Sequence, residues 1–362
     1  MYTYGNGNNM PSGYIGQTCF VSESGEGQDC TALAGSITTC QAAGIKIILS
    51  LGGANSYGYS LQSNSEAEQI GQYLWDAYAN SGNTSVQRPF GDGVYVNGFD
   101  FDIETNGGSS QYYASMISTL RSNFASDTNN KYYITGAPQC PIPEPNMGVI
   151  IGNSTFDYLW VQFYNNNNGW PSTPNTTYES CSLGFDGNAP FNYDQWVDYI
   201  ATTPSSGAKI FIGVPAAPLA SNGNPDGEVY YATPAQIATL VSEYKSNPVF
   251  GGIMMWNAGF SDSNVNNSCT FAQETYEILN TGSPCGGSGS TGPGTTTTTT
   301  ISSTQTSTTK TTATTTSTGT PPVGTVGAYD QCGGSGYSGS TNCIAGYVCT
   351  EISSAWSQCD PA

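Results

Sequence analysis

The stretch from residue 96 to residue 105 constrains the fold most strongly, because apolar and acidic side chains alternate along it. An alternation with a period of two is typical of a β-strand whose two faces meet different surroundings. The apolar residues are Phe99, Phe101 and Ile103, and the acidic residues are Asp100, Asp102 and Glu104. We therefore expect three carboxyl groups on one face of a single strand.

Three carboxyl groups on one face of a strand lie close enough to change one another's pKa. Neighbours on one face of a strand lie roughly 6.5–7 Å apart, and no basic residue between Gly93 and Thr119 neutralises them. Like charges and partial burial raise the pKa of at least one carboxyl group, so that one is protonated near neutral pH while another is ionised. A glycosidase needs this combination, because an acid protonates the leaving oxygen while an anion stabilises the developing positive charge.

Two other interpretations of the acidic strand are weaker. The acids could simply face water on an exposed strand, but the bulky Phe and Ile partners favour a strand that packs on a core. The acids could instead bind a divalent metal, but calcium-binding loops use flexible polar spacers and a turn glycine. We therefore expect neither a metal nor another cofactor.

The composition favours an extracellular protein that acts on a neutral polymer. The 362 residues include 7 Lys+Arg and 26 Asp+Glu, which give a net charge of -19, so nucleic acids and anionic membranes are poor partners. The absence of histidine excludes Ser-His-Asp and Cys-His catalysis. Eleven cysteines and the sequons at Asn83, Asn153, Asn175 and Asn266 indicate secretion. No apolar run is long enough for a membrane span.

The order of expected elements indicates an α/β fold. Residues 1–28 are rich in Gly, Asn and Ser and predict a loop. The expected strands are 45–53, 96–105, 132–137, 158–164, 209–214 and 252–256. The expected helices are 29–43, 65–78, 113–124, 193–201, 233–244 and 271–279. Strands that alternate with helices over about 250 residues favour a parallel sheet closed as a (β/α)8 TIM barrel, which needs eight strands rather than six.

The carboxyl ends of the strands are the expected place of the active site, because barrel enzymes carry their catalytic groups there. Gly52 and Gly53 would let the backbone approach a ligand closely, although a plain tight turn explains them equally well. Tyr164 and Trp256 also end strands. Taken alone, these two aromatic residues are better explained by core packing.

Several motifs together carry a family resemblance. The chain has S-L-G-G at 50–53, A-P-Q-C-P at 137–141, V-Q-F-Y-N-N at 161–166, N-G-F-D-F-D-I-E at 97–104, and Trp256. This set resembles the signatures of family 18 glycoside hydrolases, specifically the fungal and plant chitinases related to hevamine. The resemblance covers most of residues 1–285.

The resemblance implies an endochitinase that hydrolyses β-1,4 bonds between N-acetylglucosamine units by a substrate-assisted retaining mechanism. Glu104 would protonate the glycosidic oxygen and later activate water, while the N-acetyl carbonyl of the substrate attacks the anomeric carbon. Asp102 would orient that N-acetyl group and stabilise the positive intermediate. Asp100 would hold Asp102 and share its proton, and Tyr164 would hydrogen-bond the same amide oxygen.

The same resemblance implies four substrate-binding residues, which are Gly52, Gly53, Gln162 and Trp256. Trp256 would lie under the reacting sugar, because an aromatic face suits the C–H groups of a pyranose ring. Chitin is then the expected partner, and we expect the chain to act as a monomer.

The chain departs from the family pattern in two places. Asn97 replaces the first Asp of the acidic motif, away from the chemistry, and we expect a modest structural effect. Family members also begin with a strand of the Tyr-Trp-Gly-Gln-Asn type, a helix and a second strand, whereas Tyr2-Thr3-Tyr4 follows those elements. We therefore expect a truncated barrel without its first two strands and first helix, which would also account for the missing signal peptide.

The composition changes after the expected catalytic domain at 1–285. Residues 286–327 are mostly Thr, Ser, Gly and Pro, which predicts a disordered, O-glycosylated linker. Residues 328–362 hold four cysteines in a segment too small to fold by hydrophobic burial alone, so two disulfides are expected there.

The last segment has Q-C-G-G at 331–334, G-Y-S-G at 336–339 and S-Q-C at 357–359, and it resembles the fungal family 1 carbohydrate-binding module. The resemblance implies two disulfides, Cys332–Cys349 and Cys343–Cys359. A purely structural disulfide-rich domain is the alternative.

That resemblance also implies a flat binding face to which Tyr329, Trp356 and Gln358 contribute. Ala355 stands where a third aromatic residue is usual, and Ser353 where an Asn is usual. We therefore expect binding to crystalline cellulose or chitin that is weaker than in typical modules.

Seven cysteines remain in the main domain, and Cys140 and Cys181 are a candidate pair because they follow adjacent strand ends. Two rival functions also remain. An endo-β-N-acetylglucosaminidase that cuts N-glycans would use the same catalytic pattern, but a module for an insoluble polymer fits a chitinase better. A chitin-binding lectin without turnover is favoured by the missing strands and disfavoured by the presence of Glu104.

Overall fold

The computed structural model describes residues 3–5, 9–16, 18–54, 59–105, 110–166, 179–185, 189–286, 331–333, 340–343, 347–353 and 356–361. Contacts between residues divide the chain into two units, Met1–Gly286 and Gly287–Ala362. The linker expected at 286–327 lies, except for Gly286, outside the described residues.

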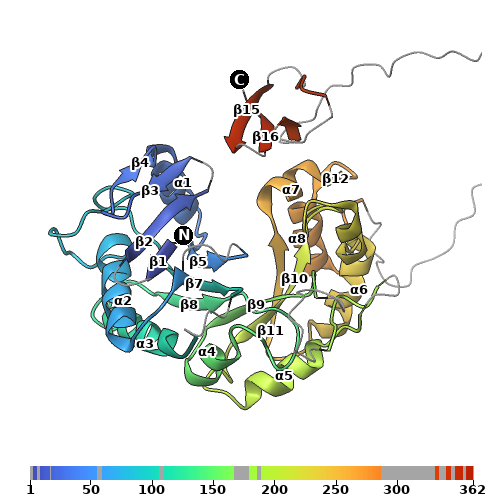
Figure 1. The fold of residues 1–362 in the computed structure, drawn as a ribbon. Coiled ribbons are helices and arrows are strands. Elements are labelled where there is room, and N and C mark those ends of the chain that lie inside the picture. Colours follow the sequence, from blue (N-terminus) through green and yellow to red (C-terminus); the bar gives the residue numbers. More distant parts are fainter. Residues whose placement is uncertain are drawn as a thin grey trace, which may run out of the picture. The chain divides into compact units, whose positions relative to one another are not determined.

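A six-stranded sheet forms the centre of the first unit, with its strands in the order β11-β10-β9-β8-β7-β5 (Figure 1). All neighbouring strands are parallel. The strands are β5 (Leu49–Gly53), β7 (Gly98–Ile103), β8 (Tyr133–Gly136), β9 (Tyr158–Gln162), β10 (Lys209–Pro215) and β11 (Phe250–Trp256). These are the six strands that the sequence predicts. Among the described residues, β5 and β11 each have one neighbour, so this sheet does not close on itself.

Helices connect the strands. Those that the sequence predicts are α1 (Thr31–Ala42), α2 (Asn64–Tyr78), α3 (Tyr113–Phe124), α5 (Tyr193–Ala201), α6 (Pro234–Tyr244) and α8 (Phe271–Thr281). Four short elements are additional: α4 (Gly148–Asn153), α7 (Ala258–Ser263), η1 (Ser110–Tyr112) and η2 (Pro225–Tyr230). They span too few residues to show a helical period in the sequence. No helix of the described ranges combines the length and the apolar character that crossing a membrane requires.

The apolar face of β7 fixes the orientation of the acidic strand. Phe99 and Phe101 are fully buried. The Phe99 ring stacks near Phe124 of α3, and the Phe101 ring meets Tyr113 of α3 edge-on. Because side chains alternate along a strand, this packing directs the acidic side chains of β7 to the opposite face.

The prediction of a loop over residues 1–28 is wrong for the described part of that segment. A second, five-stranded sheet has the order β4-β3-β2-β1-β6. The disulfide Cys19–Cys30 links β3 to the start of α1. Strands this short, separated by Gly-rich and Asn-rich turns, lack the alternation that would predict them. The strands are β1 (Thr3–Gly5), β2 (Asn9–Ile15), β3 (Cys19–Val21), β4 (Gly27–Gln28) and β6 (Tyr59–Ser60).

Two further disulfides stabilise the first unit. Cys140–Cys181 is the pair that the strand ends predict. Cys269–Cys285 joins the short hairpin of β12 (Val265–Asn266) and β13 (Cys269–Thr270) to the chain after α8. Cys40 on α1 forms no disulfide within the described ranges.

The second unit has a three-stranded antiparallel sheet in the order β14-β16-β15. Its strands are β14 (Gln331–Gly333), β15 (Tyr347–Ser353) and β16 (Trp356–Pro361). Both disulfides implied by the resemblance are confirmed, Cys332–Cys349 and Cys343–Cys359. Trp356 and Gln358 belong to β16, whereas Tyr329 lies outside the described residues.

Candidate active site

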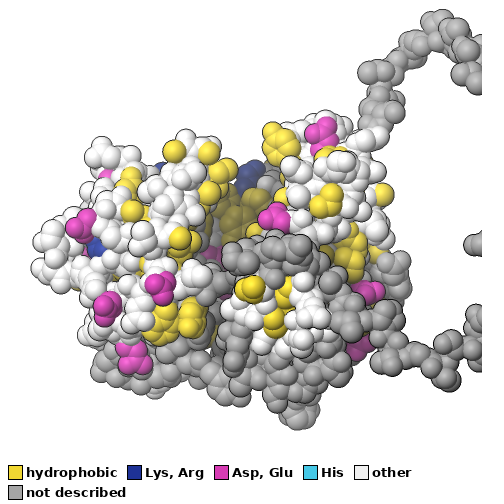
Figure 2. Space-filling view, turned by 90° about the horizontal axis from the view of Figure 1, so that it is seen from above, with side chains coloured by type: hydrophobic (Ala, Val, Ile, Leu, Met, Phe, Trp, Pro, Cys, Tyr) yellow, Lys and Arg dark blue, Asp and Glu magenta, His cyan; other side chains and the backbone are white. Residues whose placement is uncertain are grey.

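A cavity opens at the carboxyl ends of β5, β7, β9 and β11. The structure brings seven of the eight predicted residues of the first unit to its walls, and the remaining one, Gly52, precedes Gly53. On the face that Figure 2 shows, hydrophobic side chains lie in a central hollow and acidic side chains are scattered singly among neutral ones. The predicted residues at the walls are Gly53, Asp100, Asp102, Glu104, Gln162, Tyr164 and Trp256.

Asp100 is held by hydrogen bonds from side chains on three other strands of the sheet, β5, β8 and β9. Its Oδ2 accepts a hydrogen bond from the Ser50 hydroxyl on β5 at 2.8 Å. Its Oδ1 accepts hydrogen bonds from the Thr135 hydroxyl at 2.6 Å and from the Trp160 indole N–H at 3.0 Å. Burial raises the pKa of Asp100, and the three donors partly offset that shift. The carboxyl group is therefore fixed in position.

Asp102 and Glu104 share a hydrogen bond. Burial raises the pKa of Asp102 well above its ordinary value, and the nearby carboxyl groups of Glu104 and Asp100 raise it further. Burial also raises the pKa of Glu104, while hydrogen bonds from Gln162 and Asp102 lower it. Burial and like charge favour the protonated forms, so this pair of carboxyl groups keeps a shared proton to higher pH than isolated carboxyl groups do.

Gln162 at the end of β9 connects the acids to the next strand. Its Nε2 donates to the Ala137 carbonyl at 2.9 Å and to Asp102 Oδ1 at 3.2 Å, and Glu104 Oε1 lies 3.5 Å away. The sequence predicts Gln162 as a substrate-binding residue only. Its contacts show that it also orients the two carboxyl groups.

Tyr164 lies just beyond β9 and is 5% exposed. Burial raises the pKa of its phenol well above the ordinary value, and the negative charges of Asp102 and Glu104 act in the same direction. The phenol is therefore protonated and can donate a hydrogen bond into the cavity. The Asn166 side chain fixes this turn, because its Nδ2 donates to the Tyr164 carbonyl at 2.6 Å and to the Gln162 carbonyl at 3.3 Å.

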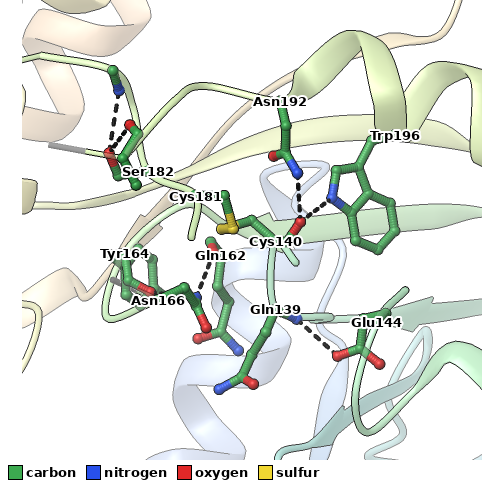
Figure 3. The surroundings of a disulfide bond; sticks show 12 residues. Gln139, Cys140, Glu144, Gln162, Tyr164, Asn166, Cys181, Ser182, Asn192 and Trp196 are labelled. Atoms are coloured by element: carbon green, nitrogen blue, oxygen red, sulfur yellow. Dashed lines mark hydrogen bonds between the residues drawn. A yellow bond between two sulfur atoms is a disulfide. The ribbon is translucent and has the colours of Figure 1, made fainter. Parts of the chain in front are cut away.

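The disulfide Cys140–Cys181 joins the segment after β8 to a position before α5 (Figure 3). The Cys140 carbonyl accepts hydrogen bonds from the Asn192 side chain and from the Trp196 indole, both at 2.9 Å. The Cys181 N–H donates to the Asn166 carbonyl at 3.1 Å. A side chain of α5 and a covalent bond thus fix the backbone beside Gln162 and Tyr164.

The two glycines and the tryptophan shape the cavity. Gly52 has φ of +104°, and Gly53 has φ of +108°. A Cβ at Gly53 would lie 3.9 Å from Asp102 Oδ2, so the glycine leaves access to that carboxyl group. Trp256 lines the cavity at the end of β11 and is 46% exposed, so its ring is accessible to a ligand.

Sequence reasoning missed several residues of the site. Ser50 belongs to the S-L-G-G motif, and Trp160 lies two residues before Gln162 on the same strand, so strand periodicity could have found both. Thr135 contacts Asp100, and Tyr59 contacts the backbone of Glu104. No motif marks these two residues.

The departure at Asn97 has a structural explanation. Asn97 Oδ1 accepts hydrogen bonds from the Ile47 N–H and from the Gln41 side chain, both at 2.9 Å. These contacts tie the start of β7 to the segment before β5, away from the carboxyl ends. The position is structural, as the sequence predicts.

Comparisons with known proteins match each of the two units to a family. Residues 23–228 match the model of glycosyl hydrolases family 18, and residues 328–356 match that of the fungal cellulose binding domain. "Endochitinase 2" of Metarhizium robertsii is 64% identical over 359 residues, which cover 99% of this chain and 83% of that protein.

Solved structures extend the comparison. The ICChI chitinase from Ipomoea carnea is 30% identical with a TM-score of 0.57, over 72% of this chain and 85% of that chain. The xylanase and alpha-amylase inhibitor protein XAIP-II from Scadoxus multiflorus is 28% identical with a TM-score of 0.55, over 77% of this chain and 85% of that chain. The fold is of the (β/α)8-barrel type, with the six parallel strands as its central sheet. The acidic strand and the cavity at the strand ends agree with the family match over residues 23–228. This chain belongs to family 18 of the glycosyl hydrolases.

Proposed function

We propose that this protein is a secreted endochitinase that hydrolyses β-1,4 bonds between N-acetylglucosamine units of chitin with retention of configuration. The observation that carries the proposal is the row of three carboxyl groups, Asp100, Asp102 and Glu104, that lines one cavity. The high identity to fungal endochitinases supports it.

The shared proton gives Glu104 its role as the acid. When the N-acetyl group of a substrate reaches Asp102, the proton passes to Glu104, and Asp102 becomes the anion that accepts the amide N–H. Glu104 then protonates the glycosidic oxygen while the amide oxygen of the substrate attacks the anomeric carbon. The negative charge of Asp102 stabilises the positive cyclic intermediate, and Glu104 afterwards takes a proton from the attacking water.

The remaining residues orient the reacting groups. The protonated phenol of Tyr164 donates to the amide oxygen of the N-acetyl group, and Trp256 stacks under the sugar ring. Asp100 stays in place because three strands donate to it, so it supports Asp102 from behind. Gln162 and the backbone at Gly52 and Gly53 complete the sugar site.

Two rival functions are less well supported. The fold alone does not decide, because one similar structure is named as an inhibitor of other enzymes. A lectin without turnover does not need the shared proton between Asp102 and Glu104. An endo-β-N-acetylglucosaminidase does not need a module of the cellulose-binding family.

The catalytic test compares the full chain with its Glu104→Gln variant by release of soluble oligosaccharides from colloidal chitin. We expect a loss of at least about hundredfold, because general acid catalysis contributes this much. Glu68→Gln, an exposed position on α2, is the matched control and should keep full activity. An active Glu104→Gln variant, or a folded wild type that releases nothing, would contradict the proposal.

The proposal for residues 328–362 is that this module anchors the enzyme to insoluble chitin or cellulose through Tyr329, Trp356 and Gln358. Trp356→Ala in the full chain should weaken adsorption to both polymers and leave hydrolysis of soluble oligosaccharides unchanged, since an aromatic stacking contact is lost. Unchanged adsorption would exclude Trp356 from the binding face.

A further inference from the structure

A tyrosine hydroxyl joins the ends of β5 and β7. The ladder between these strands has its last paired residues at Gly53 and Ile103. Beyond them, the Tyr59 hydroxyl donates to the Gly53 carbonyl at 2.9 Å and accepts a hydrogen bond from the Glu104 N–H at 3.2 Å. The backbone of Glu104 is therefore connected to β5 through this side chain.

The Tyr59 hydroxyl makes these two contacts at once. A tyrosine hydroxyl has one donor and two acceptor positions; the Gly53 carbonyl takes the donor, and the Glu104 N–H takes one acceptor. Burial raises the pKa of this phenol, and the side chain of Thr105 and the Glu104 N–H lower it. The direction of the O–H bond is therefore set by the Gly53 carbonyl.

The ring of Tyr59 is itself fixed. It is 6% exposed and stacks on Tyr4, with ring centroids 5.5 Å apart and an interplanar angle of 17°. Tyr4 is the residue that pairs with Tyr59 across β1 and β6, and its hydroxyl hydrogen-bonds Tyr113 of α3 at 2.7 Å. The second sheet and α3 thus form a rigid support for the hydroxyl.

We propose that Tyr59 is a positioning residue that aims the carboxyl group of Glu104 at the leaving oxygen. The inference rests on the proposed function, in which Glu104 is the general acid. Glu104 follows the last residue of β7, so the ladder alone does not fix it. A displacement of about 1 Å in a catalytic group costs roughly hundredfold in rate, so a fixed backbone at this position has a large effect.

The test uses two substrates that differ in their need for an acid. In chitopentaose the leaving group is a sugar, which must be protonated, whereas in the dinitrophenyl glycoside of N,N′-diacetylchitobiose it leaves with little help. For Tyr59→Phe we expect kcat on chitopentaose to fall about tenfold to hundredfold, with KM and the dinitrophenyl reaction changed by less than about threefold. Glu104→Gln should show the same preference more strongly.

Tyr199→Phe is the matched control, because it removes a tyrosine hydroxyl that also donates to a backbone carbonyl, that of Gly148, and takes no part in the support of Tyr59. We expect it to change both substrates equally, by less than about twofold. Equal losses on the two substrates in Tyr59→Phe, or no loss, would overturn the positioning role and leave a purely structural one.

Two further outcomes are distinguishable. If Tyr59→Phe does not fold, Thr105→Val removes a polar side chain that acts on the same hydroxyl and should produce a smaller loss confined to chitopentaose; equal losses in this variant would overturn the inference. If the folded wild type cleaves neither substrate, the proposed function fails, and the role of Tyr59 fails with it.

Discussion

Gly52 on β5 and Asp102 on β7 are partners in the parallel ladder, and a Cβ on Gly52 would lie 2.2 Å from the Asp102 carbonyl oxygen. No side chain fits at this distance, and the φ of Gly52, +104°, is one that other residues rarely adopt. The close approach of the two strands therefore depends on glycine at this position.

Gly52→Ala should separate the ends of β5 and β7. We expect a loss of about 2 kcal/mol or more in the free energy of unfolding, from the strained backbone and the steric clash, together with a large loss of activity. Denaturant unfolding and hydrolysis of chitopentaose measure the two effects. Gly35→Ala is the control: Gly35 lies within α1 with open space around its Cα, and alanine there should stabilise the protein by about 1 kcal/mol. A Gly52→Ala variant with unchanged stability and activity would contradict the conclusion that the close approach of the two strands requires glycine.

Gln162→Met should move the pH dependence of activity. The Gln162 amide favours the ionised forms of Asp102 and Glu104 and so lowers the pKa at which the pair loses its shared proton. Activity requires that proton, so it is lost as the pH rises through this pKa. Without the donor the pair holds its proton more tightly, and the alkaline limb of kcat/KM should move to higher pH by about one unit. An alkaline limb that stays in place or moves to lower pH would contradict this role of the Gln162 amide. Gln72→Met, at an exposed position, is the control for the effect of replacing Gln by Met.

Asp127→Asn should destabilise the protein in a pH-dependent way. Hydrogen bonds from Asn130, Asn80 and Tyr132 lower the pKa of Asp127 to about 2. Because the folded pKa is lowered, this stabilisation is present above the unfolded pKa of about 4 and is lost as the pH falls toward about 2. At pH 6 we expect a loss of about 1 kcal/mol after solvent screening, which shrinks at pH 3. Urea unfolding at both pH values measures it, with the exposed Asp262→Asn as control; a loss independent of pH would argue against an ionic contribution.

Cys140–Cys181 should contribute more to stability than Cys19–Cys30, because it closes the longer loop. Cys140–Cys181 closes a sequence separation of 41 and Cys19–Cys30 one of 11. Loop-closure entropy predicts losses of about 4 and about 3 kcal/mol when each pair is replaced by alanine. Removal of the longer bridge should also reduce activity, because it fixes the backbone beside Gln162 and Tyr164. Equal activity in the two double variants would show that the bridge does not support the active site.

The strongly patterned parts of the fold could be predicted from the sequence. The acidic strand shows its period directly in Phe99, Phe101 and Ile103, and all six strands of the central sheet lie where apolar runs predict them. The hairpins of β1 to β4 could not be predicted, because they are held by pairing between short segments and by the Cys19–Cys30 bridge. Elements of two to seven residues leave almost no periodic signal.

Some residues of the candidate site could likewise be predicted from the sequence, and others could not. The family motifs predict residues that the structure brings to one cavity, although their roles stay predictions until they are measured. Thr135 and Tyr59 could not be found, because their contacts depend on which strands become neighbours and on how the chain returns to β6. Such contacts are properties of the sheet order and leave no trace in the residues near each position.

The contacts of Cys181 affect which changes of loop length the fold can accept. Its N–H bonds to the Asn166 carbonyl, and its sulfur is bonded to Cys140, so Asn166 and Cys181 are held together beside Cys140. The entropy cost of closing a flexible loop between two such joined positions changes slowly with the length of the loop. This point of the fold can therefore accept new sequence, by natural variation or by loop grafting, while the carboxyl groups on β7 stay in place.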